Sequence, residues 1–444
     1  MIADPLILAV VLITVMFIFL LSSLWIGVSL ILTGIIGMLI YDHNLPPVIS
    51  IYDKVGDLLA SSLYDAMNSW SLAALPMFIL MGEILYKSSI SAKLLNGLRP
   101  WLSHIPGGLL HVNVAACSLF AAVSGSSTAT TATVGKITLD ELQKRGYSKQ
   151  LAMGSLAGSG TLGYLIPPSL IMIIYGVMSD VSIGKLFLAG LLPGLLMASL
   201  YSFYIMYKAK VDPSVLPANE EKYTWSDKLH SLKDLAPIFL LISLVLGSIY
   251  GGYATPTEAA ALGVLGSLIL ATYFKAVSLE ILKNALLNSV RTSVMIGFII
   301  AGAVFLSQVI GFLGIARAMS EFITDLGLSP MMLILLIGVM YIILGMILEA
   351  ISIVVMTLPI VLPIVVMAGF DPLWFGVFLV FMVEMAQITP PVGFSLFVIQ
   401  SISNEKIQTI LKATLPFFIL MIVTVVIITI FPEIVFFLPD QMIK

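Results

Sequence analysis

Residues 124–135 read SGSSTATTATVG, and residues 158–169 read GSGTLGYLIPPS. Both stretches are rich in glycine and hydroxyl residues, and the second contains the pair Pro167-Pro168. Proline lacks the backbone N–H that a helix needs and disfavours helix for the residue before it, so the second stretch predicts a broken helix. These stretches decide the fold because the chain around them is strongly apolar.

The composition restricts the class of protein. Hydrophobic residues make up 59% of the 444 residues, and charged residues only 10%. A soluble domain cannot bury this share of apolar side chains. Because the apolar runs are long and continuous rather than alternating, we predict an all-α polytopic membrane protein. The net charge of −3 argues against a nucleic-acid partner, and the single Cys117 cannot form an internal disulfide.

Seven apolar runs each have close to the roughly 20 residues that a bilayer requires. They are 6–22, 24–41, 71–86, 190–207, 234–250, 257–274 and 292–313. Two other segments do not fit one helix per crossing. Residues 106–139 are too short for two crossings, which predicts a re-entrant hairpin with the serine-rich stretch at its tip. Residues 151–178 are interrupted by glycines and prolines, which predicts a broken transmembrane helix.

The same pattern recurs in the second half at an offset of 223 residues, which predicts an internal repeat. The matched pairs are Pro167-Pro168 with Pro390-Pro391, Pro193 with Pro416, and residues 124–129 with residues 347–352. Around the first hairpin, residues 93–149 contain six basic residues, whereas residues 316–372 contain only Arg317. Cytoplasmic loops collect Lys and Arg, so the two hairpins are predicted to enter from opposite sides. Inverted repeats with broken helices are typical of secondary transporters.

The predicted organisation is two inverted repeats joined by a lysine-rich cytoplasmic linker. Amphipathic stretches before each hairpin predict helices that lie in the membrane interface. The first repeat, 1–207, contains scaffold spans 1–86, interfacial arm 88–104, hairpin 106–139, broken helix 151–178 and closing span 190–207; the linker is 208–233. The second repeat, 234–444, contains scaffold spans 234–313, interfacial arm 315–326, hairpin 330–368, broken helix 373–401 and closing span 413–431.

The tips and breaks are the candidate sites. Unwound backbone is tolerated at membrane depth only where it is buried in protein or lines a cavity. Freed carbonyls and hydroxyls suit a small cation, so each tip is expected to face the break of its own half and form a sodium site. The first set is Ser124, Ser126, Ser127, Thr128, Gly160, Thr161 and Gly163; the second is Gly345, Glu349, Ser352, Thr389, Pro390, Pro391 and Gly393.

Other interpretations of these residues stay open. Small residues also let transmembrane helices pack closely, and a threonine can hydrogen-bond its own helix. Glu349 and Glu384 lie at predicted membrane depth, where each could be a sodium ligand, a proton carrier or a structural acceptor. We favour a site role for Glu349 and leave that of Glu384 open. No nucleophile or histidine metal-binding spacing is visible, so we do not expect an enzyme.

Longer motifs carry a resemblance to a known family. These are IPGGLLHVNVAACSLFAAVSGSSTATTATVG at 105–135, RGYSKQLAMGSLAGSGTLGYLIPPSLIMIIYGVMSDVSIGKLFLAGLLPG at 145–194, and EMAQITPPVGFSLFVIQ at 384–400. In them the chain resembles the large membrane subunit of tripartite ATP-independent periplasmic transporters, in the ion-transporter superfamily. The resemblance implies an elevator-type importer in a bacterial inner membrane, coupled to Na⁺. Its implied partners are a small four-helix membrane subunit and a periplasmic substrate-binding protein.

The resemblance implies that the tips and breaks are the family's sodium sites, with Ser124, Ser126, Ser127, Gly160 and Thr161 in the first and Glu349, Thr389, Pro390 and Gly393 in the second. Together with the tips and breaks themselves, we expect sodium ligands at Ser124, Ser126, Gly160, Thr161, Gly163, Gly345, Glu349, Thr389 and Pro390. We expect the substrate between the two tips, at Ser127, Thr128, Ser352 and Gly393.

The first tip departs from the sialic-acid members of the family, in which SGSA is followed by an acidic residue. Here no carboxylate occurs after the tip until Asp140. Organic acids are the leading substrate class, with dicarboxylates, keto acids and sugar acids unresolved. The alternative function is a stand-alone sodium- or proton-coupled organic anion carrier of the same superfamily, which needs no binding protein.

Overall fold

The computed structural model describes residues 4–41, 50–88, 90–217, 223–276 and 278–441. Every regular element in these ranges is a helix, and none is a strand. Seven helical segments there are long and apolar enough to cross a membrane: Trp70–Lys87, Ile183–Val211, Trp225–Tyr250, Pro256–Tyr273, Leu279–Phe312, Ala350–Met367 and Ile407–Ile430. The predicted all-α polytopic membrane class is confirmed. Parts of the predicted repeats and linker lie outside the described residues, namely 1–3, 42–49, 89, 218–222, 277 and 442–444.

The described residues of the first half, through residue 217, contain ten α-helices and three short 3₁₀ helices. They are α1 (Pro5–Leu21), α2 (Ile26–Tyr41), α3 (Ile51–Met67), η2 (Trp70–Ala73), α4 (Ala74–Lys87), α5 (Ile90–Leu102), α6 (Leu110–Ser124), α7 (Ser127–Lys144), α8 (Lys149–Gly160), η3 (Thr161–Gly163), α9 (Leu170–Ser179), α10 (Ile183–Val211) and η4 (Pro213–Val215). In this list α6 and α7 form the first hairpin, and α8, η3 and α9 form the first broken helix.

The second half repeats this order from its own hairpin onward. Its elements are α11 (Trp225–Tyr250), α12 (Pro256–Tyr273), α13 (Leu279–Phe312), α14 (Ile315–Asp325), α15 (Pro330–Gly345), α16 (Ala350–Met367), α17 (Pro372–Gln387), α18 (Phe394–Ser403), α19 (Ile407–Ile430), α20 (Glu433–Phe436) and η5 (Pro439–Gln441). Here α15 and α16 form the second hairpin, and α17 and α18 form the second broken helix. The Pro167-Pro168 and Pro390-Pro391 peptide bonds are both cis.

The sequence explains where these helices begin, and it does so at matching positions. Ser126 caps α7 by accepting from the backbone N–H of Ala129, and Glu349, 223 residues later, caps α16 by accepting from Ile351. Such caps satisfy backbone donors that the first turn of a helix leaves free. From the arm onward, both halves thus have the same order of arm, hairpin, broken helix and closing span. Their inverted orientation in a membrane stays a prediction.

Several helices are longer than the apolar runs from which they were predicted. Helix α10 begins at Ile183 rather than residue 190, and α13 covers Leu279–Phe312 rather than 292–313. Serine caps at both starts, Ser182 and Ser278, let these helices continue past the apolar run into polar sequence. Helix α3, which carries three aspartates, was not among the predicted spans.

The linker is likewise shorter than the predicted 208–233, because α10 runs to Val211 and α11 begins at Trp225. Its remaining described residues are 212–217, 223 and 224. Thr224 caps α11 with a reciprocal bond to Asp227, which explains why the helix starts well before the apolar run at residue 234.

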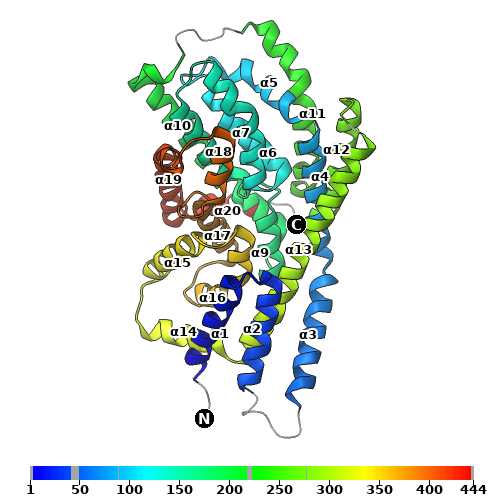
Figure 1. Ribbon diagram of the computed structural model, residues 1–444, viewed down its shortest axis with the longest axis vertical. Coiled ribbons are helices and arrows are strands. Elements are labelled where there is room, and N and C mark those ends of the chain that lie inside the picture. The colour runs from blue at the N-terminus through cyan, green and yellow to red at the C-terminus, as the bar shows by residue number, and fades with distance from the viewer. Residues whose placement is uncertain (1–3, 42–49, 89, 218–222, 277, 442–444) are drawn as a thin grey trace.

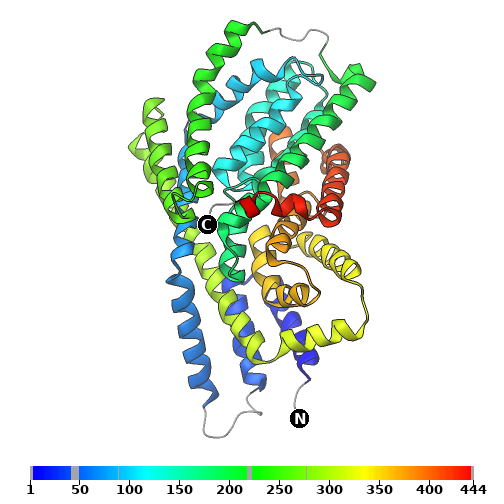
Figure 2. The same ribbon diagram turned by 180° about the vertical axis from the view of Figure 1, so that it is seen from behind.

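The helices form two groups along the length of the molecule. Helices α2, α3, α4, α12 and α13 lie on one long side, and the hairpins and broken helices lie on the other (Figure 1). The view from behind shows the same division, with the first hairpin in the upper half and the second in the lower half (Figure 2). We call the first group, together with α11, the scaffold. We call α6–α10 and α15–α19 the inner unit.

The two predicted arms are helices α5 and α14, each directly before a hairpin. Helix α5 packs on α11 of the scaffold, where the Trp101 indole N–H donates to the Ser231 hydroxyl at 3.0 Å. Helix α14 packs on α16 of the second hairpin, on α1 and on α13 of the scaffold. Both arms therefore join the scaffold side of the chain to a hairpin.

Candidate functional site

The first tip lies directly on the first break. Helix α6 ends at Ser124, and Gly125 turns the chain with φ +60°. The Gly125 carbonyl accepts from the Leu170 N–H at 3.3 Å, and a Cβ at Gly125 would lie 2.8 Å from the Pro168 carbonyl oxygen. Only glycine satisfies both the left-handed turn and this close approach.

Two further predicted residues bring the break against α7. A Cβ at Gly163 would lie 2.4 Å from the Ser127 Cα, and one at Gly160 would lie 2.0 Å from the Thr131 hydroxyl oxygen. The structure thus brings the first predicted tip and break together without space for a side chain between them. Whether they bind sodium stays a prediction.

Several hydroxyls at the sites already donate within their own helix. Thr161 donates to the Gly158 carbonyl at 2.6 Å, and Thr389 donates to the Met385 carbonyl at 2.6 Å. This is the local packing role that the sequence left open. A hydroxyl that donates its hydrogen in this way keeps both oxygen lone pairs. These bonds therefore orient the oxygens and leave them able to coordinate a cation.

The second tip also contacts its broken helix. A Cβ at Gly345 would overlap the Ala386 Cβ, at 1.9 Å, near the end of α17. Glu349 caps α16, and Ser352 in the first turn of that helix is 1% exposed. The break itself contains Gly393 in the left-handed region, with φ +35°.

Tyr164 of the first break contacts the second half of the chain. Its side chain is 3% exposed, and its backbone N–H donates to Oε1 of Glu384 on α17 at 2.8 Å. The first break therefore packs directly against the second broken helix inside the inner unit.

Glu384 is the principal residue that the sequence analysis left unassigned. It lies on α17 and is fully buried, yet its Oε1 accepts from the Ser127 hydroxyl of the first tip and from the Tyr164 N–H of the first break, the latter at 2.8 Å. The start of α7 directs the Ser127 hydroxyl toward α17, where it donates to Glu384. The expected contact of Ser127 with substrate stays a prediction. The sequence signal that could have identified Glu384 is a carboxyl group inside an apolar helix, five residues before Thr389.

A cavity of about 380 Å³ lies where the first tip meets the scaffold. Ser124, Ser126 and Thr128 line its tip side, while Glu83 and Tyr86 of α4 belong to its scaffold side. This volume is within the range typical of small-molecule sites. Of the four predicted substrate residues, Thr128 lines the cavity. The other three, Ser127, Ser352 and Gly393, are not among its described lining residues.

The scaffold wall of this cavity carries a balanced group of charges. The Glu83 carboxylate accepts from the Asn288 amide of α13 at 3.1 Å and lies 3.6 Å from the Lys87 ammonium nitrogen. The pairing offsets the negative charge of Glu83, so an anionic substrate does not meet an unpaired carboxylate there.

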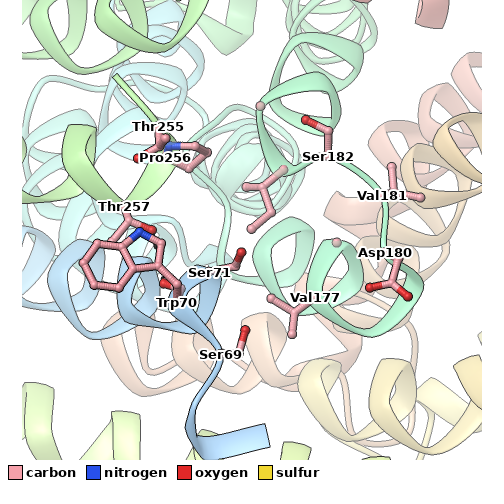
Figure 3. A pocket seen from close by; sticks show the side chains of 13 residues that line it. Ser69, Trp70, Ser71, Val177, Asp180, Val181, Ser182, Thr255, Pro256 and Thr257 are labelled. Atoms are coloured by element: carbon pink, nitrogen blue, oxygen red, sulfur yellow. Dashed lines mark hydrogen bonds between the residues drawn. The ribbon is translucent and has the colours of Figure 1, made fainter. Parts of the chain in front are cut away.

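A second pocket, of about 450 Å³, lies between η2, the end of α9 and the start of α12 (Figure 3). Its described lining residues include Asp180 and several hydroxyl residues, and, like those of the tip cavity, they include no basic side chain. None of the predicted site residues lines it. We therefore place the candidate substrate site at the tip cavity rather than here.

Comparison with known proteins decides the family. Residues 13–434 match the family described as "Tripartite ATP-independent periplasmic transporter, DctM component". The chain belongs to this family. It is 35% identical to the C4-dicarboxylate TRAP transporter large permease protein DctM of Pseudomonas aeruginosa, over 86% of this chain and 89% of that protein.

Two further similarities extend this result. The isethionate TRAP transporter permease protein DctMQ of Oleidesulfovibrio alaskensis is 32% identical over 86% of this chain, which corresponds to 60% of that longer protein. The crystal structure of the YdaH transporter of Alcanivorax borkumensis matches 85% of this chain and 89% of that one, with TM-score 0.63 and 13% identity. The likeness to YdaH concerns the fold alone. The family membership makes the chain a transporter permease subunit, in agreement with the resemblance.

Proposed function

We propose that this chain is the large permease subunit of a sodium-coupled transporter that imports a small organic acid across a bacterial inner membrane. The observation that carries the proposal is the tip cavity, in which hydroxyls of the first hairpin face the scaffold. Its hydroxyls and the positive end of α7 suit a carboxylate or sulfonate group. Relatives named for C4-dicarboxylate and for isethionate support this substrate class.

Sodium as the coupling ion is supported by the chemistry of the tips and breaks. Hydroxyls, backbone carbonyls and the Glu349 carboxylate supply oxygen ligands, which hard cations prefer. Each elementary charge that moves across 100 mV gains about 2.3 kcal/mol. Entry of two or more sodium ions with a singly charged acid would therefore use the membrane potential to drive uptake.

The proposed partners are a small four-helix membrane subunit and a periplasmic substrate-binding protein. The tripartite description of the family supports both. The DctMQ relative continues well beyond the part that matches this chain, which supports a second membrane component. In this arrangement the binding protein delivers the substrate, and the inner unit carries it past the scaffold in an elevator-type movement.

Reconstituted uptake tests the proposal. The complex of this chain with its two partners is placed in liposomes, and the acid that stabilises the purified binding protein is supplied in labelled form. Candidates for that screen are C4-dicarboxylates, keto acids, sugar acids and sulfonates. We expect uptake to require an inward sodium gradient and to fall to background when choline replaces sodium.

Two results would contradict the proposal. Uptake that persists undiminished without sodium would show that sodium is not the coupling ion. Full uptake by this chain alone, with neither partner present, favours the stand-alone organic anion carrier.

A further inference from the structure

The inference concerns Glu384, whose two carboxylate oxygens have unequal surroundings. Oε1 accepts two hydrogen bonds, from the Ser127 hydroxyl and the Tyr164 N–H. Oε2 is buried and has no hydrogen-bond partner among the described residues. The carboxylate also forms no ion pair with any described Lys, Arg or His.

A buried carboxylate oxygen without a partner is costly, because burial removes the hydration that stabilises its charge. The two donors on Oε1 fix the orientation of the group, so Oε2 has a defined position beside the first tip and break. Protonation would remove this cost by making the group neutral. A bound ligand that removes it instead must carry positive charge and fit among oxygen atoms. A small cation has both properties.

Glu384 has no acidic counterpart in the first half of the chain. Its counterpart 223 residues earlier is Thr161 of the first break, an uncharged residue. Thr161 reaches toward the other half as well, with its hydroxyl 3.7 Å from the Met421 sulfur of α19. Both residues thus cross between the halves, and only Glu384 brings a carboxylate.

We propose that Glu384 of α17 is a sodium ligand of the first tip-and-break site, supplied across the molecule from the second half of the chain. Its Oε1 holds Ser127 and Tyr164 in place, and its Oε2 contacts the ion. The first site is then complete only when both halves are packed together. This inference rests on the proposed sodium coupling and adds a ligand that neither the tip nor the break contains.

The decisive substitution is Glu384→Gln, measured with sodium chloride alone on the purified full chain bound to its small subunit. The glutamine carbonyl oxygen keeps an acceptor for Ser127 and Tyr164, while the amide replaces Oε2 with a donor that repels a cation. Thermal unfolding is followed as sodium chloride replaces choline chloride at constant ionic strength. Sodium should raise the unfolding midpoint of the wild type by linkage.

We expect Glu384→Gln to raise the half-saturating sodium concentration at least tenfold while leaving the midpoint in choline close to that of the wild type. The control is Glu280→Gln, which removes one negative charge at the exposed start of α13 and should leave the sodium response unchanged. An unchanged response in Glu384→Gln overturns the proposal.

If the glutamine variant does not fold, Glu384→Asp decides the question. Aspartate keeps the charge but withdraws it by one methylene, so the half-saturating sodium concentration should rise at least threefold, and an unchanged value overturns the proposal. The same measurements distinguish failure of this inference from failure of the proposed function. If the wild type shows no sodium response and its uptake does not depend on sodium, both sodium coupling and the role of Glu384 are wrong. If the wild type depends on sodium and the glutamine variant responds equally, only the role of Glu384 is wrong.

Discussion

Single atoms decide how closely the first tip and break approach each other. At Gly163 an added methyl group would meet the Cα and the backbone nitrogen of Ser127, at 2.4 and 2.5 Å. Backbone atoms cannot move aside as a flexible side chain does, so even the smallest side chain must separate tip from break. The spacing of the oxygen atoms around the proposed ion depends on this contact.

We therefore expect Gly163→Ala to reduce sodium-dependent uptake at least tenfold and to destabilise the fold by about 1–3 kcal/mol, the usual cost of overpacking. The matched control is Gly247→Ala in α11, where nothing lies within 4 Å of the added methyl. Uptake assays and thermal unfolding measure both effects. Normal uptake by Gly163→Ala would show that the close contact has no role in transport.

The paired hydroxyls make a second prediction at this scale. Ser126→Ala removes the cap of α7 at the first tip, and Thr389→Ala removes a hydroxyl from the second break. If both sites bind sodium, each variant should require several-fold more sodium for half-maximal uptake. Sodium titrations of uptake measure this, and unchanged sodium activation in both variants would remove the paired-site proposal.

At the scale of elements, the arms determine how the scaffold holds the hairpins. Helix α5 is fixed to α11 through the bond from Trp101 to Ser231, and Gly97 of α5 lies against Leu235 of the same helix. The first arm is therefore docked on the scaffold, while α6 continues from it into the inner unit. An arm docked in this way can act as a fixed support for a hairpin that moves.

We predict that Trp101→Phe, which keeps the ring but removes the indole N–H, loosens α5 by about 1 kcal/mol, the net value of one hydrogen bond. Hydrogen exchange along α5 should become faster, while exchange along α14, the second arm, stays unchanged. Equal exchange in α5 of the variant and the wild type would show that this bond does not hold the arm.

At the scale of the whole molecule, the tip cavity lies between the two groups of helices. Gly82 of α4 brings the scaffold close to the tip, since a Cβ there would lie 3.2 Å from the Ser124 Cα. A substrate in the cavity thus touches both groups. The proposed elevator movement requires this contact to break and re-form during each transport cycle.

A reversible cross-link tests the movement. In a Cys117→Ser background, cysteines at Gly82 and Ser124 lie close enough for a disulfide. Because Ser124 is itself a predicted sodium ligand, the reference is the uptake of the reduced double variant. We expect oxidation to lower that uptake at least tenfold and reduction to return it to the same reference level. Each single-cysteine variant, which cannot form the cross-link, should show the same uptake before and after oxidation. Full uptake with the first pair cross-linked would contradict an elevator movement of the tip along α4.

The sequence by itself determined the class of protein, the two hairpins, the two breaks and the family. The class, hairpins and breaks follow from local chemistry, since apolar runs predict spanning helices and the proline pairs 167–168 and 390–391 interrupt them. The family follows instead from the longer motifs that the chain shares with its relatives. It was less accurate for helix ends, because polar caps such as Ser182 and Thr224 extend helices beyond their apolar runs.

Only the tertiary structure decided which side chains share a site. It directed Ser127 toward α17, placed Thr128 in a cavity with the scaffold, and brought Glu384 to the first tip across 257 positions of sequence. No local pattern encodes such a contact, because it depends on how two separate halves pack. The physical reason is that hydropathy and backbone breaks act within a helix, whereas the partners of a buried carboxylate are set by every helix around it.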